Sequence, residues 1–325
     1  MTPPRMMGRS AAHTGLLERL AKIARADAEV LISGPTGVGK ELYARYLHER
    51  SSRAAFPFVA LNCGALPSDL FENELFGHVA GAFTGARPQS AGLVTEAEGG
   101  TLFLDEVDSL SLPNQVKLLR FVQEKEYRRL GDCRLLHADV RIVAATNADL
   151  MAAVKERRFR EDLFFRLRVI PVEVPPLCER PDDILPIIDG YVRHYADIYH
   201  SPPIRFTAEA LDRILRYLWP GNVRELENCI RYLTCLQLGH DVTAWELPLL
   251  EADAAGADPA RPALAGSLQE AKRVAIERIE REYMELALRA ADGNIARAAR
   301  LSGKARRAFF ELMRKHGMKA ANYAA

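Results

Sequence analysis

Three features that would narrow the function of a protein at once are missing from this sequence. Its 44 Lys and Arg residues nearly balance 43 Asp and Glu residues, so the net charge of +1 gives no evidence for a polyanionic partner. No apolar run approaches the length of a membrane span, and residues 1–13 carry no apolar core of signal-peptide length. The five cysteines form no Cys-x-x-Cys pair and no zinc-type spacing, which favours buried reduced thiols over a metal or disulfide framework. These absences predict a cytoplasmic protein without a membrane partner.

What is present is the pattern of an α/β protein. The 325 residues, 48% apolar and 27% charged, are enough for two or three globular domains. Short apolar runs in the first half predict buried strands of a mostly parallel sheet, and residues 41–50 and 114–125 have the pattern of crossover helices. The predicted strands are 30–32, 58–61, 102–104, 142–145 and 169–172.

The domain boundaries follow from changes in this pattern. The strand signal stops near Pro176, and residues 181–250 are typical of several short helices. Residues 251–266 are rich in Ala, Pro, Asp and Gly, as in a linker, and a capping box at 267–270 begins a helix that runs to about Ala291. We therefore expect an α/β nucleotide-binding subdomain (1–175), a helical lid (176–250), a linker (251–266) and a small all-α domain (267–325).

The nucleotide site is predicted from a GxxxxGK motif between a strand and a helix. It reads Gly34-Pro35-Thr36-Gly37-Val38-Gly39-Lys40. In this context backbone amides bind the phosphates and Lys40 neutralises their charge. Glu41 follows, where most P-loops place the Ser or Thr that binds magnesium, so magnesium must depend on other oxygens.

Two adjacent carboxylates, Asp105 and Glu106, end the strand at 102–104. At this distance from a P-loop, Asp105 is expected to hold Mg²⁺, directly or through water, and Glu106 to polarise the attacking water. Such a pair taken alone is more often a solvated turn.

Between these motifs lies Gly81-Ala82-Phe83-Thr84-Gly85-Ala86. The glycines permit a tight exposed loop, and the Phe-Thr pair at its tip predicts a contact surface for a partner.

Together these motifs resemble the AAA+ transcription activators that act on sigma-54 RNA polymerase. The resemblance covers about residues 8–318, and GAFTGA at 81–86 is its most specific marker. It is supported by the blocks at 74–78, 99–106, 159–167 and 219–226. Glu41 is usual after the lysine in this family.

The resemblance assigns further roles at the ATP site. Asn62 resembles the switch asparagine that pairs with Glu106, and Thr146-Asn147 resembles sensor I. Arg160 and Arg166 resemble arginine fingers that reach a neighbouring subunit, and Arg224 resembles sensor II. The alternative for each arginine is a surface ion pair.

Fingers that act in trans imply a homo-oligomer, which is a hexameric ring in this family. The resemblance places the loop at 81–86 near the ring axis, where Phe83 and Thr84 contact sigma-54 in the RNA polymerase holoenzyme. Residues 127–131 are expected beside it, and their arginines either contact the partner or form a solvated face.

The C-terminal segment predicts a helix-turn-helix. Residues 294–301, a turn at 302–304 and residues 305–316 have the required spacing, and residues 298, 299, 301, 309 and 313 are expected in its core. Residues 294–325 contain eight Lys or Arg and one acid, an excess suited to double-stranded DNA, although a basic tail that serves oligomerisation is the alternative. The candidate DNA contacts are Lys304, Arg306, Arg307, Phe310 and Arg314.

This segment resembles the Fis-type domain of the same activators, with departures. Lys304 and Ala305 replace a small apolar residue and a capping Ser, and losing such a cap costs about 1 kcal/mol of local stability. DNA binding of lower affinity or unusual specificity is therefore expected.

The sequence also bears on how the protein is regulated and on two alternative functions. The AAA+ core is expected to start almost at the first residue, without a sensory domain before it, which points to a separate regulatory protein, control by expression or constitutive activity. The rivals are another AAA+ remodeller and a repressor that acts without sigma-54, and an intact GAFTGA loop disfavours both.

Overall fold

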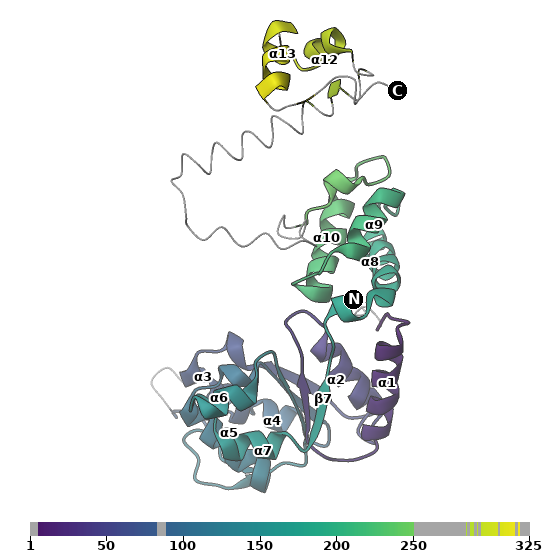
Figure 1. Cartoon of the computed structure of the whole chain (residues 1–325). Helices are drawn as coiled ribbons and strands as arrows, with labels where there is room; N and C mark the ends of the chain where they lie inside the picture. Colours follow the sequence, from purple (N-terminus) through teal and green to yellow (C-terminus); the bar gives the residue numbers. More distant parts are fainter. Residues whose placement is uncertain are drawn as a thin grey trace. The chain divides into compact units, whose positions relative to one another are not determined.

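The computed structural model describes residues 6–82, 89–249, 294–304 and 306–315, together with residues 284, 287, 288, 291 and 318. The chain divides into two compact units, Met1–Asp253 and Ala254–Ala325 (Figure 1). Among the described residues, no helix combines the length and apolar character that crossing a membrane requires.

The centre of the first unit is a parallel five-stranded sheet in the order β2-β3-β6-β1-β7. Parallel pairing joins every neighbouring pair of strands, which confirms the predicted α/β fold class. The strands are β1 (Val30–Ser33), β2 (Phe58–Asn62), β3 (Thr101–Asp105), β6 (Arg141–Thr146) and β7 (Ile170–Glu173). Each lies within one or two residues of an apolar run that predicted it, because strands covered on both faces are apolar throughout.

Alternate residues along the strands supply two separate cores. Leu31, Leu102 and Ile142 face one core, whereas Ile32 and Phe103 face the other. The first core is covered by α3 (Ser68–Phe76), α5 (Leu112–Glu124), α6 (Leu150–Lys155) and α7 (Glu161–Leu167), with α4 (Leu93–Glu96) beside α3. The second core is covered by α1 (Ala11–Ile23) and α2 (Lys40–Glu49), on the other side of the sheet in Figure 1.

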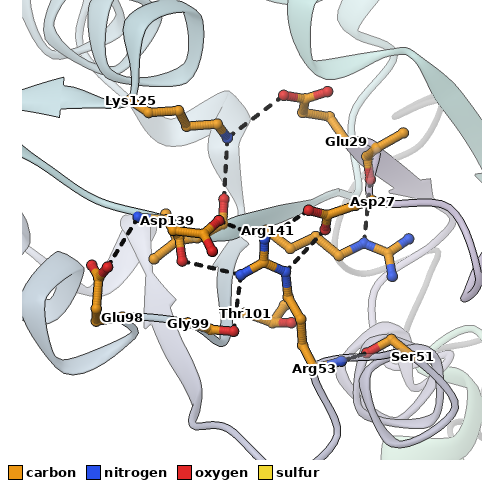
Figure 2. Close-up of polar contacts among 12 residues, drawn as sticks. Asp27, Glu29, Ser51, Arg53, Glu98, Gly99, Thr101, Lys125, Asp139 and Arg141 are labelled. Carbon is orange, nitrogen blue, oxygen red and sulfur yellow. Dashed lines mark hydrogen bonds and ion pairs between the residues drawn. The ribbon is translucent and has the colours of Figure 1, made fainter.

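A cluster of cations secures the amino ends of the strands (Figure 2). Arg53 pairs with Asp27 and Asp139 at 2.6 Å each and also donates to the carbonyl of Gly99. Arg141, at the start of β6, donates to three carbonyls at and just after the end of α1, those of residues 23, 24 and 28. Burial lowers the pKa of Arg141, and these carbonyls offset the cost of burying its charge. The end of α1 is thereby fixed to the sheet.

After β7 the first unit continues as helices. These are α8 (Ile184–Tyr199), α9 (Ala208–Arg216) and α10 (Asn222–Leu236), with 3-10 turns at Leu177–Glu179, Pro181–Asp183 and Ala244–Glu246. They enclose a core of their own, centred on Ile188, Ile214, Trp219 and Ile230. This is the helical arrangement that the loss of strand signal predicts, although α8 and α10 are longer than expected.

The cysteines differ in part from expectation. All five are free, and Cys63 and Cys229 are buried. Cys133, Cys178 and Cys235 are exposed, so the prediction of burial is wrong for these three. Cys235 lies one residue before the end of α10. It is about 200° around the helix from the buried Leu233, so its side chain faces solvent.

In the second unit, α12 (Ile295–Leu301) and α13 (Arg306–Lys315) form the predicted helix pair. Ala298, Ala299, Phe309 and Met313 are buried, as expected for its core, and Asn294 caps α12. Leu301 is 55% exposed, so its predicted place in the core is wrong. It lies about 200° around the helix from Ala299, on the opposite face. Residues 251–283, which include the predicted linker and capping box, lie outside the described residues.

Candidate functional site

The sheet brings the predicted ATP-site residues to one edge. In the register of the parallel strands, Asn62 lies beside Asp105, and Ser33, which precedes the P-loop, lies beside Thr146. The carboxyl ends of four strands therefore meet where the P-loop turns into α2, the usual place for a ligand in an open α/β sheet.

The P-loop has the backbone of an anion site. Gly37 and Gly39 have φ values of 79° and 95°, which favour glycine. No side chain caps the first turn of α2, so its backbone N–H groups remain available to a phosphate. Lys40 Nζ donates to the carbonyls of Gly34 and Pro35 at 2.8 and 3.1 Å. Burial lowers the pKa of Lys40, while Asp105, Asp108 and Glu106 act in the opposite direction.

The carboxylates lie opposite this loop. Asp105 Oδ1 accepts from the backbone N–H of Glu106 at 3.0 Å. Glu106 has a left-handed backbone (φ 53°), and its carboxylate lies so close to Gly64 that a Cβ there would be 2.3 Å from Oε2. Such strain is typical of functional positions.

Asn62 makes a different contact from the predicted one. Its Oδ1 accepts from the N–H groups of Gly64 and Ala65 at 2.8 and 2.9 Å. No hydrogen bond joins Asn62 to Glu106 among the described residues, so the switch pairing stays a prediction.

The sensor I residues contact both the P-loop and a third acid. Asn147 Nδ2 donates to Thr36 Oγ1 at 3.1 Å, and Thr146 Oγ1 donates to Asp108 Oδ1 at 2.6 Å. The motifs did not single out Asp108. Its position two residues after Glu106, on the 3-10 turn that follows β3, is the available signal.

The start of α10 rests on the P-loop. Asn222 Nδ2 donates to the Thr36 carbonyl at 3.0 Å, and the Arg224 N–H donates to the Gly37 carbonyl at 3.2 Å. A Cβ on Gly37 would lie 2.2 Å from the Gly221 carbonyl oxygen, so only glycine permits this contact. Arg224 is thus held beside the phosphate-binding loop.

Two adjoining cavities lie between the sheet and these helices. The larger, of about 530 Å³, is bordered by Lys40, Asp105, Glu106, Asn147 and Arg224. The smaller, of about 40 Å³, is mainly apolar and is lined by Met6, Met7, Val38, Leu42 and Ile187, among others. Residues that line both cavities mark their junction: Gly39, Leu42, Tyr191 and Val223.

A buried polar network joins the start of α1 to the lid beside the smaller cavity. Arg180 donates to the Tyr43 hydroxyl at 2.9 Å and to the Val38 carbonyl at 3.0 Å. Asp183 accepts from the N–H and the hydroxyl of Ser10 at 2.7 and 2.9 Å. The sequence motifs missed this network, because its members come from three segments distant in sequence: residue 10, residues 38–43 and residues 180–183.

The predicted arginine fingers lie away from this cavity. Arg160 and Arg166 are both exposed and do not border it. Arg160 pairs with Asp162 at 2.6 Å, which raises the pKa of Arg160. Neither arginine is in place to act on the site of its own chain.

Only the first two residues of the GAFTGA loop are described, and residues 83–88 lie outside the described residues. At its base, the Val79 N–H donates to the Leu130 carbonyl at 3.1 Å, and His78 exchanges backbone hydrogen bonds with Ser90. A Cβ on Gly131 would lie 2.8 Å from Ala82 Cβ. Residues 130 and 131 therefore lie beside the base of this loop, and the predicted position of residues 127–131 beside the rest of it stays a prediction.

In the second unit, the candidate DNA-contacting side chains are all exposed: Lys304, Arg306, Arg307, Phe310 and Arg314. Arg307 forms an i,i+4 pair with Glu311 at 3.4 Å.

The sheet, the P-loop and the helical lid define a P-loop NTPase of the AAA+ class. Residues 6–173 match the sigma-54 interaction domain, residues 178–261 the AAA+ ATPase lid domain, and residues 275–316 the bacterial regulatory protein, Fis family. The chain belongs to the family of regulators built on the sigma-54 interaction domain.

Several known proteins are similar over most of the chain. The transcriptional regulatory protein ZraR of Salmonella typhimurium is 43% identical over 302 residues, which are 93% of this chain and 66% of ZraR. The sigma-54-dependent transcriptional activator SfnR of Pseudomonas putida is 50% identical over 222 residues, 68% of this chain and 61% of SfnR. The crystal structure of NtrX from Brucella abortus in complex with ADP has a TM-score of 0.72 at 33% identity, covering 98% of this chain and 70% of that one. The chain spans about two thirds of the length of its curated relatives.

Proposed function

We propose that this chain hydrolyses ATP in order to activate transcription by the sigma-54 RNA polymerase holoenzyme. The observation that carries the proposal is the larger cavity, where Lys40, two strand-end carboxylates and Arg224 of the lid meet. ATP would place its phosphates on the P-loop and extend its base toward the smaller apolar cavity, which would have to widen because its volume of about 40 Å³ is smaller than a purine.

Mg²⁺ fits the donor set at this site. Asp105 would hold the ion, which supplies charge neutralisation for the phosphates when it is bound. The described residues contain no group of three or more side chains able to hold a metal alone, so the remaining ligands would be phosphate oxygens and water, as Mg²⁺ prefers.

The residues of the chain divide the hydrolysis step between them. Glu106 orients and polarises the attacking water, and Asn147 and Arg224 contact the terminal phosphate. Because Arg160 and Arg166 are remote from the cavity of their own chain, they act on a neighbouring subunit in a homo-oligomeric ring, which we propose to be a hexamer.

The GAFTGA loop would carry the work to sigma-54 through Phe83 and Thr84, and opening of the promoter complex would follow. Its base hydrogen-bonds to residue 130, so the loop and residues 127–131 move together. The Fis-type unit would bind upstream double-stranded DNA through its exposed basic residues.

The test separates hydrolysis from its use. Purified protein with ATP, Mg²⁺, sigma-54 holoenzyme and promoter DNA should convert closed complexes to open ones. Thr84→Ala should abolish this conversion while ATP hydrolysis stays within about twofold of the parent, because the loop performs no chemistry. Lys40→Ala and Asp105→Ala should lower hydrolysis itself by about a hundredfold or more.

The same assay with a chain that ends at Gly266 tests the role assigned to the DNA-binding unit. Loss of this unit should lower the yield of open complexes when the protein concentration is low. Normal ATP turnover without open complexes at any sigma-54 promoter would refute the proposal. Equal loss of hydrolysis in all three variants would refute the division of roles.

A further inference from the structure

A stripe of tyrosines on α8 faces two charged residues on α10. Tyr191, Tyr195 and Tyr199 lie on successive turns, and their rings stack with centroid separations of 6.2 and 5.9 Å. The Tyr195 hydroxyl donates to Glu227 Oε1 at 2.8 Å, and Arg231 Nε donates to the Tyr199 hydroxyl at 3.1 Å. These contacts fix the Glu227 side chain against α8.

Glu227 occupies a defined level of the nucleotide site. It borders the larger cavity, as does Arg224 one turn earlier on α10. Val223, four residues before Glu227 on the same helix face, and Tyr191 line both cavities. Glu227 therefore lies where the polar cavity meets the apolar one.

A carboxylate at this position in the nucleotide site needs a hydrogen-bond donor from the ligand. Next to a triphosphate it raises the electrostatic energy of the complex unless it accepts hydrogen bonds from the ligand. Tyr195 donates to its Oε1, and Tyr191 also hydrogen-bonds to Glu227. A carboxylate offers about four acceptor sites, so lone pairs remain for a donor of the ligand. Burial raises the pKa of Tyr195, and so the phenol stays a neutral donor.

In a nucleotide with phosphates on the P-loop and its base toward the apolar cavity, the sugar lies between them. Ribose hydroxyls are donors suited to a carboxylate. We propose that Glu227 binds the ribose hydroxyls of the nucleotide and that Tyr195 is its positioning residue, an inference that rests on the proposed ATPase function. The site would thereby select ribonucleotides over deoxyribonucleotides.

The experiment compares ATP, 2′-deoxy-ATP and 3′-deoxy-ATP as substrates of the full chain. The parent should show a KM for at least one deoxy analogue about tenfold or more above that for ATP, since a hydrogen bond to a charged group is lost. Glu227→Ala should raise the KM for ATP by a similar factor with kcat within about twofold, and should leave the KM of that analogue nearly unchanged. Glu227→Gln keeps a hydrogen-bond acceptor but loses the charge, so its KM for ATP should lie between those of the parent and Glu227→Ala.

Two tyrosine variants provide a matched pair. Tyr195→Phe removes one of the two phenols that hydrogen-bond to Glu227 and should reduce the discrimination between ATP and the deoxy analogue. Tyr199→Phe removes the equivalent atom one turn further along, where the hydroxyl accepts from Arg231, and should leave discrimination unchanged.

The outcomes are distinct. If Glu227→Ala weakens ATP and both deoxy analogues equally, or if Tyr199→Phe acts as Tyr195→Phe does, the carboxylate supports the fold and the assignment is wrong. If Glu227→Ala lowers the melting temperature, Glu227→Gln and Tyr195→Phe test the assignment instead. In both variants the ratio of the KM for the deoxy analogue to the KM for ATP should fall below that of the parent. Absence of ATP hydrolysis in the parent would instead overturn the proposed function.

Discussion

Two of the buried histidines in the first unit, His13 and His48, have a lowered pKa. His13 is 3% exposed, and its Nδ1 lies 2.9 Å from the Tyr43 hydroxyl. His48 is 6% exposed and lies 2.9 Å from Thr101 Oγ1. Burial lowers the pKa of both below the ordinary 6.5, although Asp183 acts in the opposite direction on His13.

This burial predicts how stability depends on pH. Below about pH 6.5 the unfolded chain protonates these histidines while the folded chain resists, so the unfolded state binds more protons. The free energy of unfolding should be constant near pH 8 and should fall as the pH drops through 6.5. Urea unfolding between pH 8 and pH 5 measures it, and His48→Gln should flatten part of the slope.

His240 supplies a control of opposite sign. Glu246 raises the pKa of His240, so its contribution to stability is present at low pH and is lost as the pH rises. His240→Gln should therefore steepen the loss of stability at low pH. A free energy of unfolding that does not change between pH 8 and pH 5.5 would contradict the assignment of neutral buried histidines.

At the scale of elements, the sequence predicted what local patterns encode. Strands such as β6 appear as apolar runs because both faces of the sheet are covered. The P-loop and Asp105-Glu106 were predicted because each function sits in a contiguous segment. Asp108, Arg180 and Glu227 were not, since each acts through partners that only the folded chain brings close, namely Thr146, Val38 and Tyr195. Leu301 was wrongly predicted to be in the core, because α12 ends at this residue and the pattern of apolar residues is too short there to show which face it is on.

The base of the GAFTGA loop yields a prediction at this scale. Gly131 has a φ of 78°, and a Cβ there would meet Ala82 Cβ at 2.8 Å and Ala82 Cα at 3.0 Å. Gly131→Ala should displace the loop base, so that activation by sigma-54 polymerase falls by about tenfold or more while ATP hydrolysis is kept. Open-complex yield per ATP hydrolysed measures this coupling.

Gly239 is the matched control for this substitution. Its φ of 71° gives the same backbone strain, yet nothing lies within 4 Å of an added Cβ. Gly239→Ala should lose about 1–2 kcal/mol of stability from strain alone, and Gly131→Ala about 1–3 kcal/mol more from the clash. Equal effects of both substitutions on stability and coupling would show that the contact with Ala82 does not matter.

At the scale of the whole molecule, the separation of Arg166 from its own cavity predicts complementation between defective subunits. Lys40→Ala keeps the finger and loses the site, whereas Arg166→Ala keeps the site and loses the finger. Each variant alone should hydrolyse ATP about a hundredfold or more slowly than the parent, because a finger contributes 10³–10⁵ in related phosphoryl transfers.

Mixing the two variants should restore activity that neither has. In a ring of randomly mixed subunits, about a quarter of the interfaces pair an intact site with an intact neighbouring finger, because the interface is heterologous. Hydrolysis should therefore rise to about that fraction of the parent rate at equal amounts of each variant. The rate is measured against mixing ratio, and size-exclusion chromatography checks that both variants assemble. A mixture that assembles but is no more active than its components would mean that Arg166 does not act across subunits. ATP hydrolysis would then give no reason to propose a ring.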